Sequence, residues 1–262
     1  MRQVFIIQAC FCNMNRVPTG IPGLDELIEG GFPEGSTILV AGGAGTGKTI
    51  FALQYIYAGA AVYNEPGVFI TLEEGPKNIL WNLQNFGWDY ATLNQQGLMK
   101  IYRISVNPPE RFAERWKEEI DRIIEMVKSV GAKRVALDSI TALGMLLGEK
   151  LVKSERGSEL WVGNPITLRS MIAELSERLK ELNITSVFTT GTRGGKMDFS
   201  AFGMEEFIVD GVILLYFFPP HRALFIRKMR GTNHSNKIHP MSISKNGIEV
   251  RPHDEILWEA LR

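Results

Sequence analysis

The sequence predicts an α/β fold, with a mainly parallel central sheet flanked by helices and an antiparallel β extension at its C-terminal end. Three observations predict it. Short apolar runs alternate with helical patterns through the first two thirds of the chain, which is typical of parallel strands joined by helical crossovers. A glycine-rich motif joins one early strand pattern to the helix that follows. From Asp210 onward, the sequence consists of strand-like apolar runs without a helical pattern.

Composition indicates one large domain rather than two small ones. The chain has 262 residues, with 29 Lys and Arg balanced by 29 Asp and Glu, so its formal net charge is zero. This balance argues against a general attraction to nucleic acid or to a membrane surface, although a local basic groove is compatible with it. Cys10 and Cys12 are the only cysteines, too few for a disulfide framework or a four-cysteine zinc site. We therefore expect a reducing, cytoplasmic compartment.

The first thirteen residues, "MRQVFIIQACFCN", form an N-terminal extension to the expected domain at 14–262. The apolar run Val4–Cys12 is too short to span a bilayer, and no small-residue cleavage site follows it. Three interpretations stay open: an edge strand, a segment upstream of a natural start at Met14 and, less favoured, a targeting segment. We expect no membrane partner.

The expected elements alternate in type up to Gly191. Strands are expected at Ser36–Gly42, Gly67–Glu74, Gly97–Ile104, Arg134–Ser139 and Ile184–Gly191. Helices are expected at Lys48–Tyr63, Pro76–Gly87, Pro109–Gly131 and Pro165–Leu182. A polar segment separates the fourth strand from the last helix, and a glycine-rich segment, 191–203, follows the fifth strand.

The C-terminal region contains three strand-like stretches, "GVILLYFF", "RALFIRKMR" and "HPMSISKNGIEV". The sequence "KNG" within the last stretch is typical of a hairpin turn. These stretches predict the antiparallel extension. Lys228 and Arg230 lie two residues apart in the second one, so on a strand they share one face, roughly 6–7 Å apart.

The segment "GGAGTGKT", Gly42–Thr49, fits the phosphate-binding pattern G-x-x-x-x-G-K-[ST], between an expected strand and an expected helix. Glycines allow backbone N–H groups to curl around phosphate oxygens, and the helix N-terminus adds a positive dipole. Lys48 is expected to reach the β- and γ-phosphates of ATP, and the hydroxyl of Thr49 to bind Mg²⁺. The expected nucleotide contacts are Gly43, Ala44, Gly45, Thr46, Gly47, Lys48, Thr49 and Ile50.

Three acids follow buried strands and suit catalysis at this motif. Asp138 ends the apolar strand "VALD", where a carboxylate that helps to hold Mg²⁺ is expected. Glu73 and Glu74 follow "VFITL", and a carboxylate near the γ-phosphate can orient and activate the attacking water. Adjacent strand residues face opposite ways, so we expect only one glutamate to point directly at the phosphate. The competing interpretation is an acidic helix N-terminus, because "EEGPKN" precedes a helix.

With this motif and these acids, the chain resembles the KaiC-like branch of the RecA superfamily. The matching segments are "VPTGIPGLDELIEGGFPEGSTILVAGGAGTGKT", "TLEEGPKNILWNLQNFGWD", "RVALDS", "EEFIVDGVI" and "KMRGTNHS", and the resemblance covers nearly everything after Met14. It implies a RecA-like P-loop core that binds ATP and Mg²⁺ and hydrolyses ATP. It also implies a homo-oligomeric ring, a hexamer, with nucleotide bound between subunits.

In this family a cationic pair from one subunit reaches the γ-phosphate that its neighbour binds. The motif assigns that role to Lys228 and Arg230, and the resemblance places Thr232 and His234 in the same cleft. Ser244 lies where relatives have further nucleotide contacts. An arginine delivered in trans stabilises the negative charge that builds on the transferred phosphoryl group. The alternative is a solvated basic edge strand that discourages aggregation.

Departures from the family leave other functions open. Clock-type members carry two such domains in tandem, whereas this chain has room for one; no Ser or Thr can be assigned to autophosphorylation, and Lys245 stands where relatives often have an acid. The strand end "FTTG" lacks the glutamine of RecA-type recombinases, which disfavours strand exchange. One alternative is an ATP-dependent DNA-binding protein that uses Arg193 and Lys196 of the glycine-rich segment. Another is a nucleotide-gated signalling switch with little turnover. The downstream protein partner is unknown.

Overall fold

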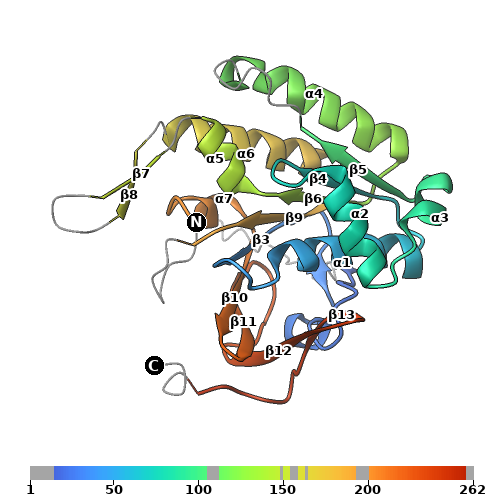
Figure 1. The fold of residues 1–262 in the computed structure, drawn as a ribbon, viewed down its shortest axis with the longest axis vertical. Helices are drawn as coiled ribbons and strands as arrows, with labels where there is room; N and C mark the ends of the chain where they lie inside the picture. The colour runs from blue at the N-terminus through green and yellow to red at the C-terminus, as the bar shows by residue number, and fades with distance from the viewer. Residues whose placement is uncertain are drawn as a thin grey trace, which may run out of the picture.

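The computed structural model describes residues 15–104, 112–147, 150–153, 159–162, 165–192 and 201–257 (Figure 1). The N-terminal extension, with both cysteines, lies outside these ranges, as do Arg193 and Lys196 of the glycine-rich segment. The expectations for those residues therefore stay expectations.

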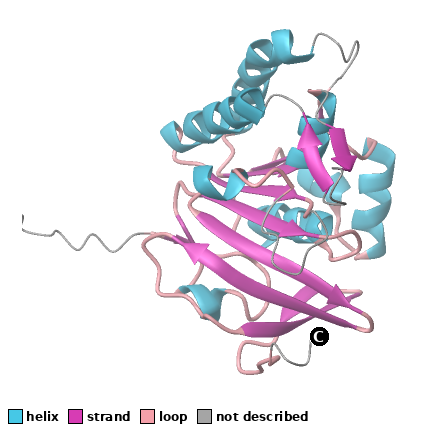
Figure 2. Ribbon diagram, turned by 90° about the vertical axis from the view of Figure 1, so that its left-hand side faces the viewer, coloured by secondary structure: helices cyan, strands magenta, loops and turns pink. Residues whose placement is uncertain are grey.

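A nine-stranded sheet forms the centre of the molecule, in the order β13-β12-β11-β10-β3-β9-β6-β4-β5 (Figures 1 and 2). Strands β10, β3, β9, β6, β4 and β5 are parallel neighbours, and β11, β12 and β13 continue the sheet antiparallel. The predicted α/β class, with its mainly parallel core and C-terminal antiparallel extension, is confirmed. The bounds are β3 Thr37–Gly42, β4 Gly67–Thr71, β5 Met99–Arg103, β6 Arg134–Asp138, β9 Thr185–Thr190, β10 Gly211–Phe218, β11 His221–Met229, β12 Ile238–Ser244 and β13 Gly247–Val250.

Helices cover both faces of the parallel strands, because those strands are apolar on both sides. On one face Leu39 and Val135 belong to a core that includes residues of α4, α5 and α6, which Figure 1 shows together above the sheet. On the other face Val40 and Ala136 belong to a core that includes residues of α1, α2 and α3. The bounds are α1 Lys48–Val62, α2 Pro76–Asn85, α3 Tyr90–Gln95, α4 Phe112–Val130, α5 Ile140–Leu146, α6 Pro165–Glu181 and α7 Glu205–Ile208.

Short elements account for most differences from the expected order. Helices α3 and α5 were not expected, yet each starts at a side-chain cap: Asp89 accepts from the Thr92 N–H at 3.1 Å, and Ser139 accepts from the Ala142 N–H at 3.3 Å. Strands β7 (Lys150–Lys153) and β8 (Glu159–Val162) pair antiparallel within the segment interpreted as merely polar. These pieces are four to seven residues long, too short for a periodic signal.

The leader segment before β3 folds against the C-terminal strands. It contains β1 (Arg16–Val17), the 3₁₀ helix η1 (Asp25–Ile28) and β2 (Phe32–Pro33), with β1 and β2 paired. Leu24 and Ile28 of the leader share a core with Ile226 of β11 and Val250 of β13. The leader is therefore part of the sheet's support.

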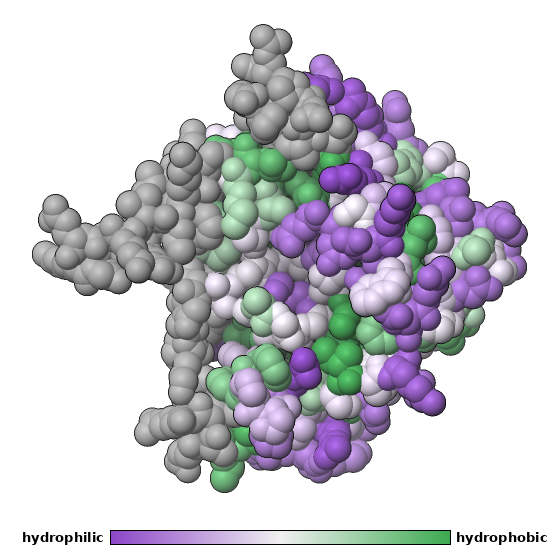
Figure 3. Space-filling view, viewed as in Figure 1, coloured by the Kyte–Doolittle hydropathy of each residue, from purple (hydrophilic) through white to green (hydrophobic). Residues whose placement is uncertain are grey.

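On the face seen in Figure 3, polar side chains gather over the helical side at the upper right, and apolar side chains form separate patches. None of the helices in the described part of the chain combines the length and the apolar character that crossing a bilayer requires.

Candidate functional site

The predicted phosphate-binding motif forms a loop between β3 and α1, which we call the phosphate cradle (Gly42–Thr49). Gly45 has a φ of 73° and Gly47 a φ of 103°, a region that L side chains rarely adopt. A Cβ on Gly47 would also lie 2.7 Å from Ile243 Cδ1. The cradle therefore needs glycine both for its turn and for its close packing under the β12–β13 hairpin.

The side chain of Lys48 folds back over the cradle. Its Nζ donates to the carbonyl oxygen of Gly43 at 2.9 Å, and the hydroxyl of Thr46 donates to the same oxygen at 2.9 Å. Burial lowers the pKa of Lys48, while the nearby carboxylates of Asp138 and Glu73 favour its charged form. The ammonium thus lies among the groups that were predicted to surround the phosphates.

Thr49 and Asp138 meet at the start of α1. The Thr49 hydroxyl donates to Asp138 Oδ2 at 2.9 Å, and the hydroxyl of Thr189, on β9, donates to Asp138 Oδ1. Burial raises the pKa of Asp138, although both hydroxyl donors oppose that shift. Two neighbouring strands, β6 and β9, and the start of α1 therefore converge on one buried carboxylate.

Glu73 and Glu74 lie near this centre. The expectation that only one of them points at the phosphate assumed that both lie on a strand, and they do not; which of them points there stays a prediction. Strand β4 ends at Thr71, and the two glutamates lie in the bend after it, where strand alternation no longer applies. Glu73 Oε1 accepts from the Ser139 hydroxyl, and Glu74 Oε2 accepts from Asn82 Nδ2 at 3.3 Å. Burial raises the pKa of Glu74, and the charges of Asp138 and Glu73 raise it further.

The residues present fit Mg²⁺. Thr49 and Asp138 supply adjacent hard oxygen donors, which this cation prefers. Within the described ranges, no group of three or more His, Cys, Asp and Glu side chains is arranged to hold a metal ion by itself. A magnesium ion held here by Thr49 and Asp138 would need further oxygen ligands, which phosphate and water supply at nucleotide sites.

Arg222 and Phe217 reach the cradle from the β10–β11 hairpin, and sequence reasoning missed both. The Arg222 guanidinium lies 3.4 Å from the Gly45 carbonyl oxygen and 4.3 Å from the centre of the Phe217 ring. A groove of about 870 Å³ is lined by Arg222, by residues of β12 that include Ile243, and by the C-terminal segment. The signal that could have found them is Pro219–Pro220, which marks a tight turn and pairs Phe217 with Arg222.

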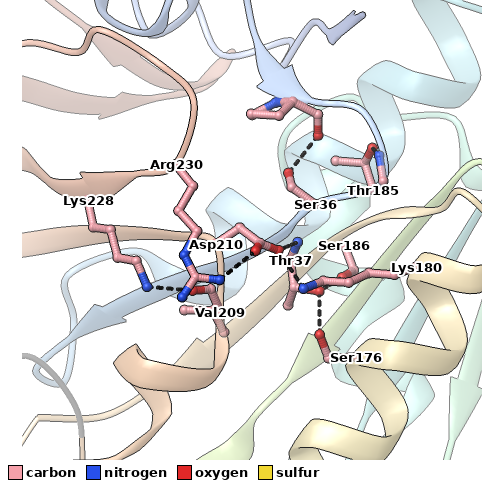
Figure 4. A network of polar contacts seen from close by, with 12 residues as sticks. Ser36, Thr37, Ser176, Lys180, Thr185, Ser186, Val209, Asp210, Lys228 and Arg230 are labelled. Carbon is pink, nitrogen blue, oxygen red and sulfur yellow. Dashed lines mark hydrogen bonds and ion pairs between the residues drawn. The ribbon is translucent and has the colours of Figure 1, made fainter. Parts of the chain in front are cut away.

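Lys228 and Arg230 lie near the opposite end of β3 from the cradle. Gly211 pairs with Ile38 on one side and with Met229 on the other, so the chain enters β3 beside the end of β11. Lys228 Nζ donates to the carbonyls of Val209 and Glu206 at 2.7 and 3.0 Å, and Arg230 Nη1 lies 3.2 Å from Asp210 Oδ1 (Figure 4). Burial and the charge of Arg230 lower the pKa of Lys228.

The rest of the cationic segment, which we define as residues 228–234, is held by the leader. Thr232 Oγ1 accepts from Arg16 Nη1 at 2.6 Å, and the carbonyl of Gly231 accepts from Arg16 Nη2 at 3.2 Å. His234 Nδ1 lies 3.1 Å from the carbonyl of Ser235. The two most specific stretches of the sequence, the leader and "KMRGTNHS", therefore support one another.

Ser244 lies with the cradle rather than with the cationic segment. It ends β12 next to Ile243, whose side chain packs on Gly47, and its hydroxyl accepts from the Asn246 N–H at 3.1 Å in the hairpin turn. The predicted residues thus fall into two groups. Ser244, the cradle and the three acids share one end of the sheet, and Lys228, Arg230, Thr232 and His234 share the other.

Comparison with known proteins decides the family. The model of the family described as "ATPase: KaiC" matches residues 17–156 and 158–255. This chain belongs to the KaiC ATPase family. It shares 36% identity over 258 residues with UPF0273 protein MJ1359 of Methanocaldococcus jannaschii, covering 93% of this chain and 99% of that protein.

Two further relatives agree with that assignment. Circadian clock oscillator protein KaiC of Thermostichus vulcanus is 35% identical over 246 residues, which are 91% of this chain and 44% of the clock protein. The crystal structure of KaiC-like protein PH0186 from Pyrococcus horikoshii OT3 superposes with a TM-score of 0.75 at 39% identity, covering 91% of this chain and all of that one. The resemblance to KaiC-like proteins of the RecA superfamily is confirmed, and with it a nucleotide-binding ATPase fold.

Proposed function

We propose that this protein hydrolyses ATP, with Mg²⁺, at interfaces between copies of itself in a homo-oligomeric ring, a hexamer by resemblance to its family. One observation carries the proposal: the chain has a phosphate cradle at one end of β3 and a cationic pair near the other. Neither half is complete alone, because a P-loop ATPase needs positive charge where the γ-phosphoryl group leaves.

The geometry within one copy supports transfer of the pair to a neighbour. Met229 lies beside Gly211 and Ile38, whereas the cradle begins four residues farther along β3, at Gly42. At about 3.3 Å per residue, that offset is roughly 13 Å along the strand alone. The Lys228 amine also points away from the cradle, toward the carbonyls of Glu206 and Val209. A second copy brings the two halves together without rebuilding either.

The cradle's own residues divide the work of binding. Backbone N–H groups of Gly43–Thr49 and the N-terminus of α1 hold the phosphate oxygens, and Lys48 adds a cation. Thr49 and Asp138 hold Mg²⁺, which neutralises phosphate charge when bound. Ser244, next to Ile243, which packs on Gly47, adds a nucleotide contact from the end of β12.

Glu73 and Glu74 orient and activate the attacking water. Glu73 is fixed by the Ser139 hydroxyl, and Glu74 by Asn82, so both carboxylates are held near Asp138. A raised pKa makes Glu74 a better proton acceptor than an ordinary glutamate. Lys228 and Arg230, with Thr232 and His234, approach from the neighbouring copy. In the cytoplasm, ATP hydrolysis by the ring is coupled to an unidentified protein partner.

The test is ATP turnover per subunit, measured over a range of protein concentrations beside the mass of the particle with and without ATP. We expect turnover per subunit to rise with concentration as the oligomer forms. Full turnover by a strictly monomeric particle would overturn the proposal, because the cationic pair would then have no site to complete.

A further inference from the structure

Asp210 lies between the start of β3 and the cationic pair, and it is bonded to both (Figure 4). Its Oδ2 accepts from the Thr37 N–H at 3.0 Å and from Lys180 Nζ at 2.8 Å. Its Oδ1 lies 3.2 Å from Arg230 Nη1. The backbones are joined as well, since the Asp210 N–H donates to Thr37 O at 2.9 Å and the Arg230 N–H donates to Asp210 O at 3.0 Å. Arg230 is therefore tied to Asp210 at two points.

The anchor beneath Asp210 is rigid. The Thr37 hydroxyl lies 2.8 Å from that of Ser176 on α6, and the Ser186 hydroxyl of β9 donates to it at 3.0 Å (Figure 4). All three side chains are buried. Buried hydroxyls that satisfy one another in this way fix the rotamers that they join. A carboxylate resting on this network has a defined position relative to the sheet.

The charges around Asp210 leave Arg230 attractive to an anion. Lys180 already balances the single negative charge, at a shorter distance than Arg230 does. Burial opposes ionisation of Asp210, but the bonds from Lys180 and the Thr37 N–H outweigh it, so the pKa of this carboxyl lies below its ordinary value. The Arg230 guanidinium meets Asp210 through one of its nitrogens, Nη1, and its side chain is 58% exposed. Donors remain for a phosphate.

The same short stretch holds the second cation. The carbonyls of Glu206 and Val209 accept hydrogen bonds from Lys228 Nζ. The next residue in the sequence, Asp210, binds Arg230. Residues 206–210 thus determine where both cations lie. The compact ammonium of Lys228 is held by single backbone carbonyl oxygens. The planar guanidinium of Arg230 is held by a carboxylate, which can also set its orientation.

We propose that Asp210, anchored on Thr37 and charge-balanced by Lys180, is a positioning residue that orients Arg230 toward the phosphate bound by a neighbouring copy. This inference rests on the proposed function. It assigns Asp210 no contact with ATP: the residue acts through Arg230. Misplacement of a catalytic group by about 1 Å can cost about 10²-fold in rate, which sets the expected scale.

The first experiment is steady-state kinetics of Asp210→Asn in the full chain. The asparagine oxygen can still accept from the Thr37 N–H, so the fold is retained, but the ion pair with Arg230 is lost. We expect kcat to fall about 10- to 100-fold with KM for ATP within about twofold of wild type, because ground-state binding belongs to the cradle. Asp121→Asn is the matched control, since it removes an ion pair with Arg178 between α4 and α6, and its kcat should not change. An unchanged kcat in Asp210→Asn overturns the proposal.

Mixed assemblies locate the defect. Asp210→Asn chains, with an intact cradle, are combined with Lys48→Ala chains, which keep Asp210 and Arg230 but have a disabled cradle. If Asp210 acts through Arg230, the Lys48→Ala chains supply a correctly oriented Arg230 to the intact cradles of the Asp210→Asn chains, and the mixture regains turnover. A parallel mixture of Arg230→Ala with Lys48→Ala should regain turnover in the same way. Rescue of Arg230→Ala but not of Asp210→Asn overturns the positioning role alone. Rescue of neither overturns the proposed function as well.

A second variant tests the same proposal if Asp210→Asn does not fold. Lys180→Gln removes the balancing ammonium and leaves Asp210 to hold Arg230 alone. Arg230 is then bound more tightly within its own copy, and we expect a lower kcat that added salt partly restores by weakening the ion pair. A lower kcat that salt does not restore, or an unchanged kcat, contradicts the proposed charge balance.

Discussion

The two ends of β3 are built in different ways. At its carboxyl end, the phosphate cradle consists of consecutive residues, and its shape follows from glycines with positive φ, such as Gly45 and Gly47. Near its amino end, the cationic segment is held by residues that lie far apart in the sequence, including Arg16, Lys180 and Asp210. The first site is a property of local backbone, and the second is a property of tertiary structure.

This difference predicts two kinds of failure. Damage to the cradle should abolish nucleotide binding, because every phosphate contact made within one copy begins there. Damage to the cationic segment should leave binding intact and slow the chemical step, because its charge matters most in the transition state. Variants that fail in the opposite way would break the comparison.

The largest effect is expected for Lys48→Ala. Removing the ammonium leaves the phosphates without the cation that lies over the cradle, beside Gly43. We expect binding of ATP to be lost and turnover to fall at least about 10³-fold. Isothermal titration with ATP and Mg²⁺ measures the binding. Lys128→Ala, at an exposed lysine on α4, serves as the control and should bind normally. Tight binding by Lys48→Ala would contradict the role of the cradle.

Arg230→Ala should separate binding from turnover. The variant keeps the whole cradle, so we expect affinity for ATP within a few-fold of wild type and kcat lower by about 10³-fold, the usual contribution of an arginine supplied to a phosphoryl transfer. Equilibrium binding and steady-state kinetics on the same preparation check it. Arg227→Ala is the matched control, because Arg227 is an exposed cation on β11 just outside the cationic segment. Equal losses of affinity and rate would contradict the division of labour.

Sequence was sufficient for the cradle and insufficient for the support of the cationic segment. The glycine spacing before Lys48 specifies its own backbone, so the loop was predicted residue by residue. Lys228 and Arg230 were noticed as a pair, but Asp210 was not, because its partners come from positions 37, 180 and 230. The predicted strand ran too far, to Glu74, because the end of β4 at Thr71 depends on where pairing with β6 stops. Contacts of high sequence separation leave no local pattern to find.

The glutamates test whether the cradle end also performs chemistry. We expect Glu73→Gln and Glu74→Gln together to lower kcat by about 10²-fold or more, with binding of ATP retained, because a general base is lost while the phosphate contacts remain. Single-turnover hydrolysis separates this effect from product release. Glu125→Gln, on the exposed side of α4, is the control. Unchanged turnover in the double variant would instead favour a nucleotide-gated switch that hydrolyses slowly in any case.

The smallest effect concerns stability at the amino end of β3. Asp210 has a pKa below its ordinary value in the folded chain, so its ionised form stabilises the fold at any pH above the unfolded pKa, about 4. That contribution is lost as the pH falls through the lower folded value. Urea unfolding of the nucleotide-free protein should therefore show Asp210→Asn less stable than wild type by about 1–2 kcal/mol at pH 7, the range for hydrogen bonds to a charged group. The gap should stay constant down to about pH 5 and narrow below about pH 4. Asp121 is more exposed, so Asp121→Asn should cost under about 1 kcal/mol. A gap for Asp210→Asn that widens toward low pH would mean that the carboxylate is held at a net cost, and that the cationic segment is not fixed by its charge.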